Sequence, residues 1–288
     1  MKSFFSKFKN LLLIGAYKTL VIFEKLTNKG IALDFISKDY IDNPYKTYNL
    51  MRSHKPILFS QTTRLHWVTK MEFAQEMLRD KRFSVDDRKY PIAEKRRKEF
   101  KKAGREIMLE QFENPSMLKL DPPDHSRIRK LVQYGFTNRY ITSLEPQIKK
   151  IVEDCLDKVH NQDSFDLIED LAKPLPAIVI AKMMGLPNED LDQFQAWSED
   201  LLVGVGGIGT TKEDIKRSGD AYEALINYFE EIILSRKNSP GDDFIGKLIQ
   251  AEEEGDKLNI KEMYGTCLLL LIAGHETTTR LIGNGMFT

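Results

Sequence analysis

Long apolar runs at helical spacing alternate with charged stretches along most of this chain, which predicts a mainly α-helical protein. The strongest run opens with Asn259 and Glu262, an amide and an acid three residues apart that form a capping-box pattern. Residues 267–273 then follow as an unbroken apolar stretch. A helix that is apolar all round belongs in the interior, and this one is too short to span a bilayer. We expect the rest of the chain to be organised around it.

The same helix turns polar in its middle, at Gly274, Glu276 and Thr277. Buried polar groups cost free energy unless each finds a partner, and a helical glycine costs about 1 kcal/mol relative to alanine. We therefore expect a flat or bulky group to approach the backbone at Gly274. Glu276 and Thr277 place a carboxylate beside a hydroxyl, which are the parts of a proton relay. The alternative is a kinked structural helix whose threonines bond back to carbonyls one turn earlier.

Two well-known motifs have partial or chance matches in this sequence. His275-Glu276 starts like the zinc motif His-Glu-x-x-His, but position 279 is Thr. Residues 204–209 match Gly-x-Gly-x-x-Gly, yet a helical pattern precedes them and no parallel strands follow. We interpret this stretch as a link between two helices, and we predict no metal ligands.

Other segments give simpler patterns. Residues 56–60 and 66–69 predict two strands joined by a polar turn. Residues 211–236 predict a long helix with an apolar side, formed by Tyr222, Leu225, Ile226, Phe229 and Ile233. Residues 83–120 are irregular and strongly charged, and we interpret the basic run at 94–98 as a solvated helix face.

A second informative stretch follows at Asp121. Asp121 is a good N-cap, Pro122 fits the first helical position, and Asp124 suits the positive end of a helix. His125 and Arg129 lie on the apolar face of the helix that follows. Two donors of positive charge that face inward need a buried anion. The alternative is a partly exposed helix from which Arg129 extends into solvent.

The six residues Ala273-Gly274-His275-Glu276-Thr277-Thr278 resemble the oxygen-binding helix signature of the cytochrome P450 family, Ala/Gly-Gly-x-Asp/Glu-Thr-Thr/Ser. The resemblance implies a long central helix that crosses the distal face of a haem. Ala273 and Gly274 would be cofactor-binding residues that leave room for dioxygen. Glu276 and Thr277 would be catalytic residues that deliver protons to it.

His125 and Arg129, which follow Asp-Pro-Pro, are similar to the helix of that family that binds the haem propionates. The two motifs also occur in the family's order. The resemblance extends from about residue 35 to the end, and it implies a mainly α, cytochrome P450-like fold with a small β-hairpin near the N-terminus, incomplete at the C-terminus. We expect residues 1–30 to form a basic and apolar N-terminal segment, and residues 31–288 to be the N-terminal part of a single domain.

The resemblance also implies a b-type haem and the insertion of oxygen from O2 into an apolar small molecule. Electrons would come from a ferredoxin, a flavodoxin or a reductase. The family's Glu-x-x-Arg helix and its Phe-x-x-Gly cysteine loop are not in this sequence, and neither Cys155 nor Cys267 has that context. Because the chemistry needs the axial thiolate, we expect an inactive fragment that does not hold haem stably. The alternatives are one half of a split enzyme, or a non-catalytic helical module that binds a partner or a membrane surface.

Composition narrows the setting. The net charge is zero, which gives no indication of nucleic-acid binding. Two cysteines in apolar or helical contexts favour a reducing, cytoplasmic location. Residues 1–30 alternate basic and apolar groups without a clean cleavage site for a signal peptide. They predict either a helix on a membrane surface or a helix packed on its own domain.

Overall fold

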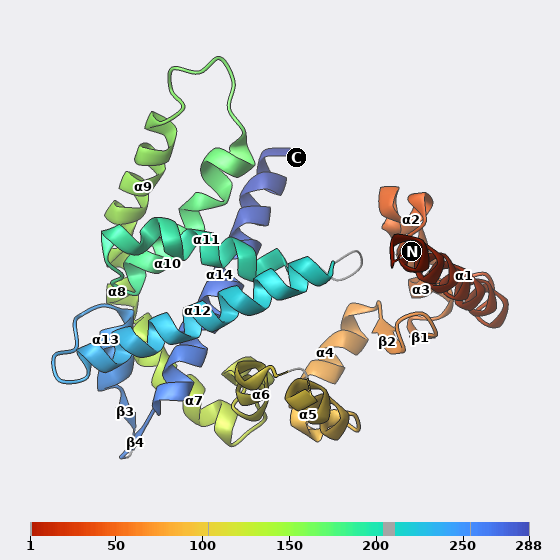
Figure 1. Ribbon diagram of the computed structural model, residues 1–288, viewed down its shortest axis with the longest axis horizontal. Helices are drawn as coiled ribbons and strands as arrows, with labels where there is room; N and C mark the ends of the chain where they lie inside the picture. Colours follow the sequence, from red (N-terminus) through yellow and green to blue (C-terminus); the bar gives the residue numbers. More distant parts are fainter. Residues whose placement is uncertain (1, 103, 204–210, 254, 288) are drawn as a thin grey trace. The chain divides into compact units, whose positions relative to one another are not determined.

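The computed structural model describes residues 2–102, 104–203, 211–253 and 255–287. Helices make up most of the described chain, beside two short antiparallel hairpins, which confirms the mainly α fold (Figure 1). The chain divides into two compact units, Met1–Phe83 and Ser84–Thr288. The predicted link at residues 204–209 lies outside the described residues.

The first unit packs helices around one hairpin. Its elements are α1 (Lys2–Thr27), α2 (Lys38–Asp42), α3 (Pro44–His54), β1 (Ile57–Ser60), β2 (Leu65–Val68) and α4 (Met71–Arg79). The strands are antiparallel, with Ile57 opposite Val68 and Ser60 opposite Leu65, so the predicted hairpin is confirmed. A small core lies beneath it and contains Ile31, Leu33, Met51 and Leu58.

A buried carboxylate joins α1 to this hairpin. Glu24 is fully buried, and its oxygens accept hydrogen bonds from the backbone N–H of Gln61 at 3.0 Å and from the hydroxyl of Ser60 at 3.2 Å. Longer bonds come from the backbone N–H groups of Leu33 and Thr62. Since buried charge is costly without such donors, this arrangement holds the C-terminal part of α1 on its own unit.

The second unit contains the remaining helices and a two-residue hairpin. Its elements are η1 (Asp87–Lys89), α5 (Ala93–Lys102), α6 (Glu106–Glu113), η2 (Met117–Lys119), α7 (Asp124–Gln133), η3 (Tyr134–Phe136), α8 (Asn138–Ser143), α9 (Glu145–Asp157), the π-helical turn η4 (Ile168–Ala172), α10 (Pro174–Met183), η5 (Asn188–Asp190), α11 (Leu191–Val203), α12 (Lys212–Arg236), α13 (Phe244–Gln250), β3 (Glu252–Glu253), β4 (Asp256–Lys257) and α14 (Ile260–Phe287). The predicted irregular segment 83–120 therefore contains two α-helices, and α5 covers the basic run at 94–98 that we interpreted as a helix face.

Helix α14 is the centre of this unit. It packs against η4, α10, α11, α12 and α13, and Figure 1 shows it passing among them. The predicted capping box is present, because the Asn259 side chain accepts the N–H of Glu262 at 3.0 Å and Glu262 accepts the N–H of Asn259 at 2.9 Å. Tyr222, Leu225, Ile226, Phe229 and Ile233 are all buried, as the pattern of α12 predicted.

Candidate functional site

Helix α14 leaves one of its faces open at the motif that interrupts its apolar run. Ala273 and Thr277, one turn apart, are both exposed. The hydroxyl of Thr277 donates to the carbonyl oxygen of Ala273 at 2.6 Å. The helix is continuous through this point, so the threonine bonds back one turn instead of opening the helix.

Gly274 lies on a different side of the helix. A Cβ added to Gly274 would stand 3.0 Å from Cδ1 of Ile180, which belongs to α10. We expected a flat or bulky group to approach the backbone here, and in this chain the neighbour is an isoleucine of the next helix. The glycine therefore permits the close approach of α10 and α14.

Glu276 is half-buried and its carboxylate forms an ion pair with Arg280, one turn later. Arg280 is exposed, so this pair sits at the surface of the unit. Among the described residues no hydrogen bond joins Glu276 to Thr277. Glu276 and Thr277, the two residues of the predicted relay, therefore have different partners, Arg280 and the carbonyl of Ala273.

His275 and the adjacent Thr279 lie on the packed side of α14. The hydroxyl of Thr279 donates to the carbonyl of Ala172 at 2.9 Å, at the end of the π-helical turn η4. His275 is 3% exposed, and its Nδ1 has no hydrogen-bond partner among the described residues. Burial lowers the pKa of His275, while a contact with the Lys173 backbone works in the opposite direction. The neutral imidazole is therefore the form that suits this position.

Helix α7 begins at Asp124, so the prediction that Asp121 caps it is wrong. The carboxylate of Asp121 instead accepts hydrogen bonds from the Ser84 hydroxyl at 2.5 Å, the Val85 N–H at 3.1 Å and the Lys89 ammonium at 2.7 Å. These partners, Lys89 first, lower the pKa of Asp121 to about 2. Three nearby donors on residues 84–89 compete successfully with the helix end for this carboxylate.

His125 is half-buried and Arg129 is exposed, although Ile128 and Val132 beside them are buried. The prediction that Arg129 points inward is therefore wrong. Its long side chain extends from the apolar face into solvent, which was the alternative. Within the described part of the chain, neither side chain forms a hydrogen bond or an ion pair. Both basic groups are left available to an external anion.

One carboxylate connects the two motif-bearing helices. Glu262, which completes the capping box of α14, also forms an ion pair with Arg127 of α7. Arg127 reaches Asp256 as well, at 3.4 Å. The start of α14 is thus fixed to the helix that carries His125 and Arg129.

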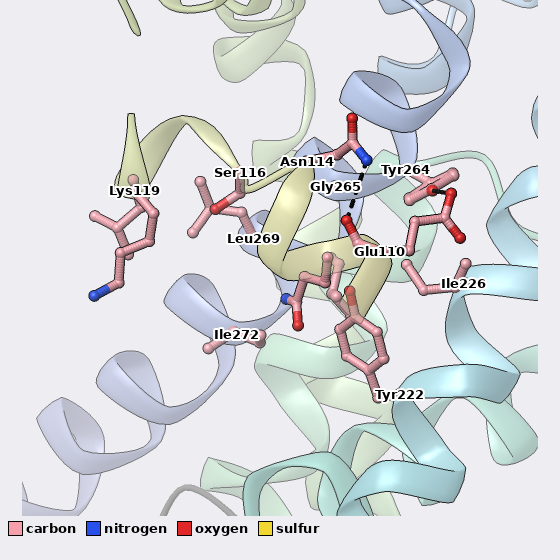
Figure 2. A pocket seen from close by; sticks show the side chains of 13 residues that line it. Glu110, Asn114, Ser116, Lys119, Tyr222, Ile226, Tyr264, Gly265, Leu269 and Ile272 are labelled. Carbon is pink, nitrogen blue, oxygen red and sulfur yellow. Dashed lines mark hydrogen bonds between the residues drawn. The ribbon is translucent and has the colours of Figure 1, made fainter. Parts of the chain in front are cut away.

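A cavity of about 200 Å³ opens beside the first half of α14 (Figure 2). Its walls come from α6, the segment 114–119, α12 and α14. Leu269 lines it, and Leu269 lies one helical turn before Ala273 and two turns before Thr277. The cavity and the two exposed motif residues therefore lie along a single face of the helix.

Neither cysteine presents a thiolate. Both are buried, and burial raises the pKa of Cys155 and raises that of Cys267 to about 12. A metal-bound cysteine reacts as the thiolate, so these two thiols do not suit an iron ligand where they stand.

Sequence reasoning missed the residues that shape the cavity. Glu110 belongs to α6, which lay in the segment taken as irregular, and Tyr222 and Tyr264 were seen only as parts of buried helices. One sequence feature could have indicated the cavity. Tyr222 is the one residue with a hydroxyl on the apolar side predicted for residues 211–236, and a tyrosine on a buried face usually needs a partner for that hydroxyl.

Comparison with known proteins agrees with the motifs. The sequence model of the family described as Cytochrome P450 matches residues 35–287. Cytochrome P450 107B1 of Saccharopolyspora erythraea is 37% identical over 218 residues, which are 75% of this chain and 51% of that protein. The biotin biosynthesis cytochrome P450 of Bacillus subtilis is 34% identical over 258 residues, covering 89% and 62% respectively.

Solved structures show the same fold. Substrate-free CYP109E1 from Bacillus megaterium superimposes with a TM-score of 0.72 at 32% identity, over 85% of this chain and 60% of that one. P450BioI, in complex with an acyl carrier protein ligated to hexadec-9Z-enoic acid, gives 0.73 at 31% identity, over 86% and 62%. The first curated relatives are matched over only 40–60% of their own length.

No helix in the described ranges combines the length and apolar character that a membrane crossing requires. The family match includes both α7 and α14, together with the hairpin β1–β2 that precedes them. Motifs, fold and relatives lead to the same assignment, and the chain belongs to the cytochrome P450 family.

Proposed function

We propose that this chain is the distal part of a haem-thiolate monooxygenase, which inserts oxygen into an apolar small molecule. The observation that carries the proposal is the shared face of α14, where a cavity wall at Leu269 continues to Ala273 and Thr277. Haem is the family's cofactor, and when bound it supplies the iron at which O2 is activated. One oxygen atom enters the substrate and the other leaves as water, with two electrons from a redox partner and two protons.

The distal residues fit a haem in character. Ala273 is small and exposed, so we propose that it leaves space beside the cofactor. Gly274 faces Ile180 of α10, so we propose that it supports the cofactor site indirectly, by letting α14 pack close to α10. His125 and Arg129 would hold the propionates, because neither has a protein partner among the described residues and Arg129 is exposed. Charge-assisted hydrogen bonds to carboxylates are the strong class of such contacts.

Thr277 and Glu276 are the proposed proton-handling residues. Because the Thr277 hydroxyl donates to Ala273, its oxygen lone pairs remain free to accept a hydrogen bond on the open side. Glu276 would supply protons after leaving Arg280, whose ion pair with it is a surface pair of low stability. In this arrangement the threonine holds a hydrogen-bonded water or oxygen in place and the acid exchanges with solvent.

The iron's thiolate would come from a cysteine other than Cys155 and Cys267, in a segment or a second chain that carries the family's Phe-x-x-Gly loop. The test is a carbon-monoxide difference spectrum of the reduced protein, recorded for residues 1–288 and for the chain completed with that loop. We expect the band typical of thiolate ligation only in the completed protein. That band in the 288-residue chain would contradict the assignment of the missing ligand, and its absence from the completed protein would contradict the function.

For partners, we propose a ferredoxin-, flavodoxin- or reductase-type electron donor and a cytoplasmic setting. A membrane-surface contact has its own support, because α1 exposes Ile22 at 59%, Phe23 at 50% and Leu26 at 79% while Glu24 holds the helix in place. Replacing Ile22, Phe23 and Leu26 with Ser should abolish co-sedimentation with anionic vesicles. Equal sedimentation of the variant would contradict this contact.

A further inference from the structure

One hydroxyl opens onto the cavity beside α14 and has no hydrogen-bond partner among the described residues. Tyr222 of α12 is 8% exposed and lines the cavity. In Figure 2 its hydroxyl points away from α12 and into the pocket. Gln111 also lines this pocket, yet among the described residues no hydrogen bond reaches the Tyr222 hydroxyl. A ligand that fills the cavity would cover this hydroxyl, and covering it without supplying an acceptor would cost free energy.

Tyr264 and Glu110, which also line the cavity, already have partners. The hydroxyl of Tyr264 donates to Glu110 at 3.4 Å, as the dashed line in Figure 2 shows, and Lys261 forms an ion pair with the same carboxylate. Burial is the main reason that the pKa of Tyr222 is raised, and Tyr264 and Glu110 raise it further. Tyr222 is therefore protonated at neutral pH and offers one unused donor.

The charges near this donor select against an anion. The negative charge of Glu110, which lines the cavity, acts on both tyrosines. Of the two lysines in this region, Lys261 is paired with Glu110 and Lys119 lies 3.6 Å from Asp87. The apolar part of the wall is aliphatic, with Ile226, Leu268, Leu269 and Ile272. A carboxylate placed at Tyr222 would meet the field of Glu110, and both of these lysines already have acidic partners.

We infer that Tyr222 determines substrate specificity by donating a hydrogen bond to a neutral acceptor oxygen, a carbonyl or hydroxyl, on an otherwise apolar molecule. The inference rests on the proposed function, since it identifies this cavity as the substrate site, and it names the chemical class of substrate. Buried donors discriminate strongly against ligands that leave them unpaired.

The test uses three aromatic probes of similar shape: acetophenone, which has a carbonyl; cumene, which has none; and benzoate, which is an anion. Binding to the haem-free chain of residues 1–288 is followed through the NMR signals of ring-labelled tyrosines, with the Tyr222 signal assigned from Tyr222→Phe. We expect acetophenone to bind more tightly than cumene and benzoate. Tyr222→Phe should weaken acetophenone by about two- to tenfold, the range of one neutral hydrogen bond, and leave cumene unchanged.

Tyr228→Phe is the matched control, because Tyr228 is on the same helix and its hydroxyl bonds to Asp190 at 2.7 Å. It should leave the affinity for acetophenone unchanged. Equal affinities of the unmodified chain for acetophenone and cumene would overturn the inference, as would an equal loss in the two variants. The readout needs neither haem nor oxygen, so a failure of the monooxygenase proposal would appear separately, in the carbon-monoxide spectrum.

Discussion

The hydroxyl of Thr277 donates to the carbonyl oxygen of Ala273 at 2.6 Å, while the hydroxyl of Thr279, two residues later, reaches across to Ala172 of η4 at 2.9 Å. The first threonine stands on the open face of α14 and the second faces its packed side. Identical side chains in one helix therefore have separable roles, one in the proposed chemistry and one in packing.

Thr277→Ala in a completed, haem-loaded protein should uncouple electron use from product. A positioned proton-transfer group contributes about 10²–10⁴-fold, so we expect product formed per electron to fall about tenfold or more. Thr279→Ala is the matched control, and it should lower stability by about 0.5–1.5 kcal/mol through the lost hydrogen bond to Ala172 while coupling stays unchanged. Equal coupling in the two variants would count against the role of Thr277.

Substitution of Gly274 can test whether Ile180 is the group that requires a glycine at this position. Gly274→Ala should gain about 1 kcal/mol of helix propensity but crowd Cδ1 of Ile180, which would stand 3.0 Å from the new Cβ. In an Ile180→Val background, which removes Cδ1, the same substitution should become clearly stabilising. Thermal unfolding of the four variants in this cycle measures the coupling, and additive effects would mean that Ile180 does not set the requirement for glycine.

His125 and Arg129 should matter for haem retention. Replacing both with Leu in the completed protein should weaken haem binding at least about tenfold, because a single charged hydrogen bond contributes about 1.5–3 kcal/mol. Arg139→Leu removes an exposed cation from α8 and serves as the control. Haem transfer to an acceptor protein gives the rate of loss. A double variant that retains haem as long as the control would exclude these residues as propionate ligands.

The stability of the 288-residue chain should fall as the pH drops below the pKa that His275 has in the unfolded state. Burial lowers the pKa of His275 below its ordinary value of 6.5, so the unfolded state takes up the proton more readily. The stabilisation is complete above that value and is lost as the pH falls towards the folded pKa. Melting temperatures measured between about pH 5 and pH 8 should vary less in His275→Gln. The exposed His160→Gln should not flatten the profile.

The helices, their caps and the first hairpin were predictable, because the helical period and capping chemistry depend on residues close together in the sequence. Asn259 and Glu262 cap α14 as their spacing predicted, and Thr211 caps α12 through a hydrogen bond with the N–H of Asp214. The paired strands at 57–60 and 65–68 lie within one residue of the two runs predicted at 56–60 and 66–69, which a polar turn joins. Each of these features is decided by residues within a few positions of one another.

The tertiary partners were not predictable in the same way. Asp121 has a sequence suited to an N-cap, but Ser84 and Lys89 bind it from more than thirty positions away. Gly274 signals a close approach without saying which group approaches. Glu110 lines the cavity because it belongs to α6, and the many charged residues around α6 led us to predict an irregular segment there. In each case a neighbour distant in sequence decides the role, and local preference does not identify that neighbour.

Glu262 contacts both α7 and α14, and this has a consequence for how the two motif-bearing helices can change position. One carboxylate sets the first turn of α14 and also anchors Arg127 of α7. A shift of α14 along its axis would therefore pull on the helix that carries His125 and Arg129. We therefore expect substitutions that alter the start of α14 to displace both the motif at residues 273–278 and the helix that carries His125 and Arg129.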